Sequence, residues 1–144
     1  MCIRDSCKGA FFFALKWYII ISMIKYDIRS VSIIIMSLFY ISVGINHFTK
    51  PYWFLQIVPP YLPYKLELVY ISGFLEIILG VMLLIPSARF YAGWGLIILL
   101  LAVYPANIYL AQTNGAAMNT TPLIAWGRLP FQFIFIALAY WHTK

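Results

Sequence analysis

Acidic side chains are scarce in this sequence, whose 144 residues contain only 4 Asp and Glu against 10 Lys and Arg. No two carboxylates stand at a spacing suited to acid–base catalysis, and neither a phosphate-binding glycine loop nor a nucleophile–base motif is found. The positive charge forms no basic stripe interleaved with base-stacking aromatic residues. We therefore expect no nucleic-acid partner and no independent enzyme, because basic residues at helix ends serve topology and contacts with lipid headgroups.

Cysteine is equally scarce. The two cysteines, Cys2 and Cys7, both precede the first clear membrane span. A thiol–disulfide relay through the membrane needs a cysteine pair poised in the core of the protein, and this chain has none there. No spacing of Cys and His residues resembles a zinc site, so we expect no bound metal.

The sequence has too few polar residues to cover the surface of a soluble domain, since 64% of it is hydrophobic and 19% aromatic. Four long apolar segments fill most of it, and about 20 helical residues cross a bilayer core of about 30 Å. The sequence therefore predicts an all-α fold, a polytopic transmembrane four-helix bundle. The expected spans are residues 31–48, 66–85, 90–111 and 122–141.

The first 30 residues stand apart from these spans. Met1 to Ser6 resembles a translated sequencing adapter, which would place the natural start at Met23 or Met36. The apolar run from Ala10 to Ile24 is short for a span and is interrupted by Lys16, so it is either an interfacial helix, a signal-like segment or an artefact of the adapter-like start. We expect two parts, an N-terminal segment over residues 1–30 and a transmembrane domain over residues 31–144.

The connector over residues 49–65 contains four prolines and several aromatic rings, which prefer the membrane–water boundary. Apolar residues between Pro51 and Pro59 predict a short interfacial helix there, and Pro59-Pro60 ends it. The small, polar, uncharged segment over residues 112–121 predicts a flexible loop. Basic residues then set the orientation by the positive-inside rule, with both termini cytoplasmic in the inner (plasma) membrane. Lys25, Arg29, Arg89 and Lys144 fall on that side, and Lys50 and Lys65 on the other.

Glu76 stands near the middle of the second span, where a charge is expensive and requires a partner or water. Ser72, Glu76 and Gly80 recur every four residues and so share one helix face. The two small residues would let a neighbouring helix approach that face closely. Ser37 and Gly44, seven residues apart on the first span, predict a second close contact.

Five further polar residues fall in the outer half of the predicted bundle: Asn46, His47, Asn107, Arg128 and Gln132. Arg128 and Glu76 differ in depth by only about 6 Å at 1.5 Å per helical residue, so we expect a buried ion pair between them, supported by the other polar groups. Two interpretations remain open. The cluster is either a pocket for a headgroup, a quinone ring or an anionic metabolite, or a clasp that fixes helix register. His47 alone, at a helix end, is more typical of an interfacial histidine than of a ligand.

Several motifs over residue 31 to the end together resemble the DoxX-like family of small membrane proteins. They are Gly44-Ile45-Asn46-His47-Phe48, Lys50-Pro51, Ile57-Val58-Pro59-Pro60, Tyr70-Ile71-Ser72-Gly73 with Glu76-Ile77 and Gly80, Leu83-Leu84-Ile85-Pro86, Ala92-Gly93-Trp94-Gly95, Tyr104-Pro105-Ala106-Asn107-Ile108-Tyr109, and Trp126 with Arg128-Leu129-Pro130 and Gln132. The resemblance implies a four-helix transmembrane bundle. It also implies a link to redox systems, because the family takes its name from a membrane subunit of a thiosulfate:quinone oxidoreductase.

Three functions follow from these patterns. The first is a membrane subunit or accessory protein of a quinone-linked redox system, which would bring a redox protein as partner and a quinone as cofactor. The second is a binding or carrier protein for a small solute, which with four spans would have to form a homo-oligomer. The third is a structural or lipid-organising protein of the bilayer.

Overall fold

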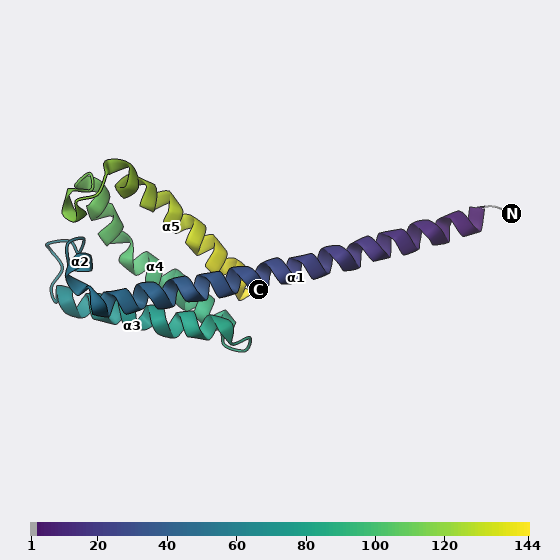
Figure 1. Cartoon of the computed structure of the whole chain (residues 1–144), viewed down its shortest axis with the longest axis horizontal. Helices are drawn as coiled ribbons and strands as arrows, with labels where there is room; N and C mark the ends of the chain where they lie inside the picture. Colours follow the sequence, from purple (N-terminus) through teal and green to yellow (C-terminus); the bar gives the residue numbers. More distant parts are fainter. Residues whose placement is uncertain (1–2) are drawn as a thin grey trace. The chain divides into compact units, whose positions relative to one another are not determined.

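A computed structural model describes residues 3–144, with the side chains of residues 16–19 and 28–144. The described part is helical and contains no strand, which confirms the predicted all-α class. The elements in chain order are α1 (Ile3–Thr49), α2 (Pro51–Leu55), α3 (Lys65–Leu84), α4 (Arg89–Gln112), the 3-10 helix η1 (Ala116–Met118) and α5 (Pro122–Thr143) (Figure 1).

The chain divides into two compact units, Met1–Ile33 and Ile34–Lys144. The division lies three residues beyond the boundary that the sequence predicts after residue 30. The interpretation of the first apolar run as an interfacial helix depends on side chains that lie outside the described residues. The second unit carries all the polar residues of the predicted cluster, and the rest of the structure is described for that unit alone.

Among the described residues, four helical segments are long and apolar enough to cross a membrane, which confirms the predicted spans to within about three residues at each end. They are Ile28–Thr49, Lys65–Leu84, Arg89–Gln112 and Pro122–Thr143. Only 17% to 28% of the residues in these segments are buried inside the protein. Large apolar side chains such as Ile98 and Phe131 are more than 60% exposed, which is expected where lipid and not water surrounds the helices.

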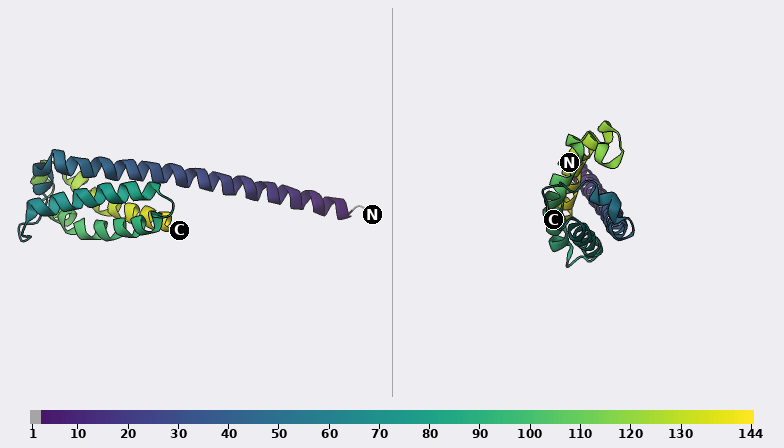
Figure 2. Two further views of the ribbon diagram at one scale, coloured as in Figure 1. Left: turned by 90° about the horizontal axis from the view of Figure 1, so that it is seen from below. Right: turned by 90° about the vertical axis from the view of Figure 1, so that its left-hand side faces the viewer.

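α4 occupies the centre of the second unit, where it packs against α3 on one side and against α5 on another (Figures 1 and 2). Small residues make both contacts close. A methyl group on Gly95 would lie 2.5 Å from Leu79 of α3, and one on Gly93 would lie 2.5 Å from Thr143 of α5. Association of membrane helices depends on such close contact, because burial of apolar surface from lipid provides little driving force.

α1 and α3 meet along small residues on both helices. The hydroxyl of Ser37 donates a hydrogen bond of 2.7 Å to the carbonyl oxygen of Gly80. Further along, a methyl group on Gly44 would lie 2.6 Å from the carbonyl oxygen of Gly73, and one on Gly73 would lie 2.5 Å from the Cβ of His47. The close contact predicted from Ser37 and Gly44 is therefore confirmed, and it brings His47 against α3.

On α3, however, the prediction that Ser72 lies at a close contact with a neighbouring helix is wrong. The buried residues of α3 are Val69, Gly73, Glu76, Gly80 and Leu83, spaced alternately by four and three. This seven-residue repeat is typical of helices that wrap gently around each other, and it places Gly73 on the shared face. Ser72 falls beside that face, where its hydroxyl donates to the carbonyl oxygen of Val69 at 2.9 Å.

The two long connectors lie at the same end of the second unit, opposite the short turn between α3 and α4 (Figure 2). A small apolar core joins them there, formed by Ile57, Leu110, Met118 and Ala125. The connector after α1 contains the predicted short helix, which begins at Pro51 and ends at Leu55. The segment predicted as a flexible loop is folded around η1, whose Met118 is only 8% exposed.

Candidate functional site

A cavity of about 450 Å³ lies among α1 to α5, which is large enough for a small ligand. The structure places all six polar residues of the predicted cluster around this cavity. His47, Glu76 and Gln132 are buried, Asn107 and Arg128 are half-buried, and Asn46 is exposed. We refer to it as the polar cavity.

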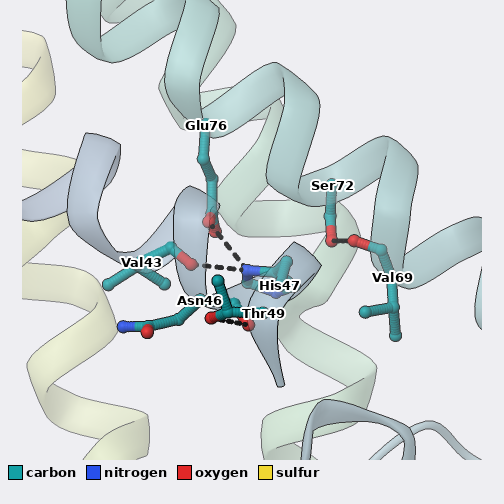
Figure 3. A network of polar contacts seen from close by, with 7 residues as sticks. All are labelled: Val43, Asn46, His47, Thr49, Val69, Ser72 and Glu76. Carbon is teal, nitrogen blue, oxygen red and sulfur yellow. Dashed lines mark hydrogen bonds and ion pairs between the residues drawn. The ribbon is translucent and has the colours of Figure 1, made fainter. Parts of the chain in front are cut away.

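Glu76 takes its ion-pair partner from α1. Its Oε2 atom lies 3.2 Å from Nδ1 of His47, and both side chains are at least about nine-tenths buried (Figure 3). The same Nδ1 atom lies 2.9 Å from the carbonyl oxygen of Val43, one turn earlier on α1. The His47 ring also stacks on Phe54 of α2, with 3.7 Å between ring centroids and 19° between ring planes. His47 is thus held by three helices at once.

Nδ1 of His47 therefore lies close to two acceptors, the Val43 carbonyl oxygen and Oε2 of Glu76. A ring nitrogen can donate only one proton, and its geometry toward the Val43 carbonyl is that of a hydrogen bond. Oε2 of Glu76 is buried and has no hydrogen-bond donor of good geometry among the described residues. The carboxylate keeps an unmet acceptor position at the wall of the polar cavity.

The predicted ion pair between Glu76 and Arg128 is wrong. Nη1 of Arg128 lies 3.8 Å from Sδ of Met118, and its guanidinium carbon lies 5.9 Å from the centroid of the Trp53 ring. Among the described residues, no carboxylate lies within ion-pair distance of this guanidinium. The prediction relied on depth in the membrane, which is similar for the two residues. In the structure, however, α4 lies between α3 and α5, so Glu76 and Arg128 line the same cavity without touching.

Gln132 and Asn107 join α5 to α4. Nδ2 of Asn107 donates to Oε1 of Gln132 at 2.6 Å, and Nε2 of Gln132 donates to the carbonyl oxygen of Leu100. Leu100 stands five residues before Pro105, whose missing N–H leaves the carbonyl of the adjacent Leu101 without its helical donor. These side-chain hydrogen bonds join α4 to α5, so this part of the cluster acts as a clasp between the two helices.

Asn46 lies at the exposed end of the cavity wall. Its backbone carbonyl oxygen accepts a hydrogen bond from the backbone N–H of Lys50 at 2.8 Å, at the point where α1 ends. Figure 3 shows its side chain pointing away from the Glu76 carboxylate. Asn46 therefore borders the cavity and does not belong to the buried cluster.

Sequence reasoning missed three aromatic residues of the site. Trp53 and Phe54 of α2 contact Arg128 and His47, and Tyr40 lines the cavity from α1. Tyr40 is 3% exposed, and its hydroxyl has no hydrogen-bond partner among the described residues. One signal was available, because Tyr40 precedes His47 by seven residues and so occupies the same face of α1.

These features define a multi-pass helical membrane protein with a polar cavity between its helices. The chain belongs to a family described as a domain of unknown function, DUF8561, whose model matches residues 36–143. Every residue that lines the polar cavity lies within the matched range. Comparison of the chain with curated proteins and with solved structures gives no match.

Proposed function

We propose that this membrane protein binds a small ligand with an anionic group in the polar cavity. The observation that carries the proposal is the position of Arg128, a half-buried guanidinium that lines the cavity and has no carboxylate partner among the described residues. Charged residues within membrane-spanning helices are costly and rare, so such residues usually serve a site.

The groups that Arg128 does contact leave most of its hydrogen-bonding capacity unused. A thioether sulfur such as that of Met118 is a weak acceptor, and the ring of Trp53 offers only a cation–π contact. Guanidinium has five N–H donors in a planar fork, which suits a carboxylate or phosphate that accepts two hydrogen bonds side by side. Glu76 is held by His47, so an anion from outside the chain is the matching partner.

The remaining wall of the cavity suits a small ligand with both polar and apolar parts. The ring of Phe39 on α1 stacks on that of Phe135 on α5, with 5.1 Å between centroids, and Tyr40 and Phe131 extend this aromatic surface. Ligand pockets in general combine mostly apolar and aromatic walls with a few polar groups that fix orientation. This combination is what distinguishes the cavity from a helix clasp, which needs no space.

The test is ligand-dependent thermal unfolding of the purified, detergent-solubilised protein. Short-chain carboxylates, phosphate esters and quinone analogues would be compared for wild type, Arg128→Gln and Arg128→Lys. We expect an anionic ligand to raise the unfolding temperature of wild type, Arg128→Lys to keep part of that shift, and Arg128→Gln to lose it. Arg89→Gln is the matched control, because Arg89 is the first residue of α4, does not line the cavity, and donates from Nε to the carbonyl oxygen of Leu83.

A protein that no ligand stabilises, and that Arg128→Gln merely weakens, would instead contain a structural clasp and would contradict the proposal. The structural or lipid-organising role inferred from the sequence would then be the better account. A carrier role for the same cavity would add one requirement, because four spans are few for transport by a single chain. Solute-dependent uptake by vesicles that contain a homo-oligomer would support it.

A second candidate is contact with a quinone, as the DoxX-like resemblance implies for a subunit or accessory protein of a redox system. The observation that favours it is the buried Tyr40 hydroxyl beside the aromatic wall, since a quinone offers a flat ring and carbonyl acceptors. An uncharged quinone should raise the unfolding temperature of wild type. A shift that is smaller in Tyr40→Phe but unchanged in Arg128→Gln would favour the quinone over the anion. Copurification with an oxidoreductase would identify the redox partner.

We also infer that the protein resides in the inner (plasma) membrane with both termini cytoplasmic. The inference rests on the distribution of basic residues, since Lys25, Arg29, Arg89 and Lys144 fall on the side of the termini, against Lys50 and Lys65 on the other side. In this orientation the polar cavity lies in the outer half of the membrane. A ligand would then reach Arg128 from the outer face or from the outer leaflet.

A further inference from the structure

A second cavity, of about 340 Å³, adjoins the polar cavity. Its wall is apolar except for two residues, His47 and Ser72, and the Ser72 hydroxyl is already bonded to its own helix. We refer to it as the apolar cavity. The two cavities share five lining residues: His47, Phe54, Ile57, Val103 and Ala106.

The shared residues form an incomplete wall between the polar and the apolar cavity. The stacked rings of His47 and Phe54 close one part of it, while the small or branched side chains of Val103 and Ala106 form another. A ligand in the polar cavity thus lies directly beside the apolar one, separated at this junction by aliphatic side chains. No Lys, Arg, Asp or Glu lines the apolar cavity, and both of its polar side chains are already engaged, His47 with α1 and α3 and Ser72 with its own helix.

The outer edge of the apolar cavity faces the lipid side of the bundle. Leu68, Ile71 and Leu75 of α3 line it and are 40%, 55% and 38% exposed. These side chains belong to a membrane-spanning helix, so acyl chains surround them. A hydrocarbon chain can therefore enter from the bilayer without crossing water.

We propose that the two cavities form one site for a single-chain amphiphile with an anionic head. The head contacts Arg128 in the polar cavity, and the hydrocarbon chain passes Val103 and Ala106 into the apolar cavity. This inference rests on the proposed function, because it assigns the same anion site a class of ligand. Neither cavity alone accounts for the arrangement, in which an unpartnered cation and an apolar, lipid-accessible space share one wall.

The size of the apolar cavity favours one chain over two. A methylene group occupies roughly the volume of a water molecule in the liquid, about 30 Å³. The space of about 340 Å³ then holds on the order of ten methylenes. A medium-length single chain fills it, whereas a diacyl lipid would leave its second chain outside.

The test uses alkyl phosphates of four, eight and twelve carbons with the full-length protein in a neutral detergent. Native mass spectrometry counts the molecules bound per chain, and titration gives their dissociation constants. We expect one dodecyl phosphate per chain, bound at least about tenfold more tightly than butyl phosphate, because each buried methylene adds to the affinity. Dodecanoate should behave like dodecyl phosphate, and dodecanol should bind weakly, because the head requires a negative charge.

Ser72→Phe fills the apolar cavity from α3 without altering the polar cavity, which Ser72 does not line. This variant should keep the affinity for butyl phosphate and lose the preference for the longer chain. Val81→Phe is the matched control, since Val81 is 45% exposed on the same helix and lines neither cavity. Ala102→Phe fills the same cavity from α4 and serves if Ser72→Phe does not fold.

Equal affinity for all chain lengths in wild type would overturn the chain subsite and leave the anion site intact. A preference for dodecyl phosphate that survives in both Ser72→Phe and Ala102→Phe would overturn it as well. Unchanged affinity for dodecyl phosphate in Arg128→Gln would overturn the contact between the head and Arg128. Binding of two-chain phosphatidic acid in place of dodecyl phosphate would show that the site holds a bilayer lipid and not a single-chain ligand. Failure of every ester and carboxylate to bind would overturn the proposed function itself.

Discussion

Nδ1 of His47 lies 3.2 Å from Oε2 of Glu76, and the pair joins the last turn of α1 to the middle of α3. Glu76 is the charged residue placed deepest in its span, so this contact decides how the carboxylate is accommodated. The same histidine ring stacks on Phe54 of the connector. The His47 side chain thus contacts both the short helix α2 and the carboxylate of Glu76.

This contact predicts energetic coupling between the two residues. His47→Ala removes the partner of a buried carboxylate and should lower the free energy of unfolding by about 3 kcal/mol. Glu76→Gln keeps the shape without the charge, so the double variant should recover part of the loss. Unfolding by a denaturing detergent, measured on wild type and the three variants as a double-mutant cycle, gives the coupling energy.

The matched control is a cycle between Glu76→Gln and Arg128→Gln. The structure places these residues across a cavity, so their effects should add to within about 0.5 kcal/mol. For the same reason, exchange of the two charges should not restore the stability that either single reversal removes. Strong coupling in this cycle, or none in the first, would contradict the contacts described here.

Gly73 should not tolerate a side chain. A methyl group there would lie 2.5 Å from the Cβ of His47, so Gly73→Ala should force α1 and α3 apart and cost about 1–3 kcal/mol. Gly127→Ala is the control, because a methyl group at Gly127 meets nothing within 4 Å. In a helix interior that change should be neutral or stabilising by up to about 1 kcal/mol. Similar losses at both glycines would show that α1 and α3 are not in close contact.

The clasp between α4 and α5 predicts non-additive effects. Gln132→Leu leaves the Asn107 amide and the Leu100 carbonyl without their partner and should cost about 1–2 kcal/mol, the range for interhelical hydrogen bonds in membranes. Asn107→Leu should cost less, and the double variant less than the sum of the two. Thermal unfolding of the purified variants measures this. Gln56→Leu, at an exposed residue of the connector, should leave the unfolding temperature unchanged.

Orientation in the membrane can be tested by cysteine labelling in whole cells. With Cys2 and Cys7 replaced by serine, Ser87→Cys in the turn between α3 and α4 should react with a membrane-impermeant maleimide only after the cells are opened. Ala116→Cys in the loop between α4 and α5 should react in intact cells. The reverse pattern would place the polar cavity in the inner half of the membrane.

The sequence predicts most of the fold because long apolar runs, proline and charge each leave a strong local signal. The four spans follow from length alone, and Pro51 and Pro59 bracket the short helix between them. The folded state of the segment after α4 leaves no such signal. It depends on Met118 packing in one core with Leu110 and with Ile57, and Ile57 lies far from Met118 in the chain.

The candidate site was predictable in its members and not in its contacts. Depth along each helix is a simple count, and it brings six polar residues to the outer half of the bundle, where the structure places them around one cavity. Which of them touch depends on the rotation of each helix about its axis, which packing decides. Gly73 and Gly44 bring α1 against α3, so that His47 and not Arg128 reaches Glu76.

Trp53 and Phe54 are consecutive residues of a five-residue helix and both line the polar cavity, but of the two only Phe54 also lines the apolar cavity. Trp53 lies beneath the guanidinium of Arg128, while Phe54 stacks on the histidine that borders both spaces. A ligand that draws Arg128 away from Trp53 therefore acts on the same short helix that orients His47. Binding linkage is reciprocal. If an anion at Arg128 changes the affinity of the apolar cavity for its occupant through this helix, the occupant changes the affinity for the anion by the same factor.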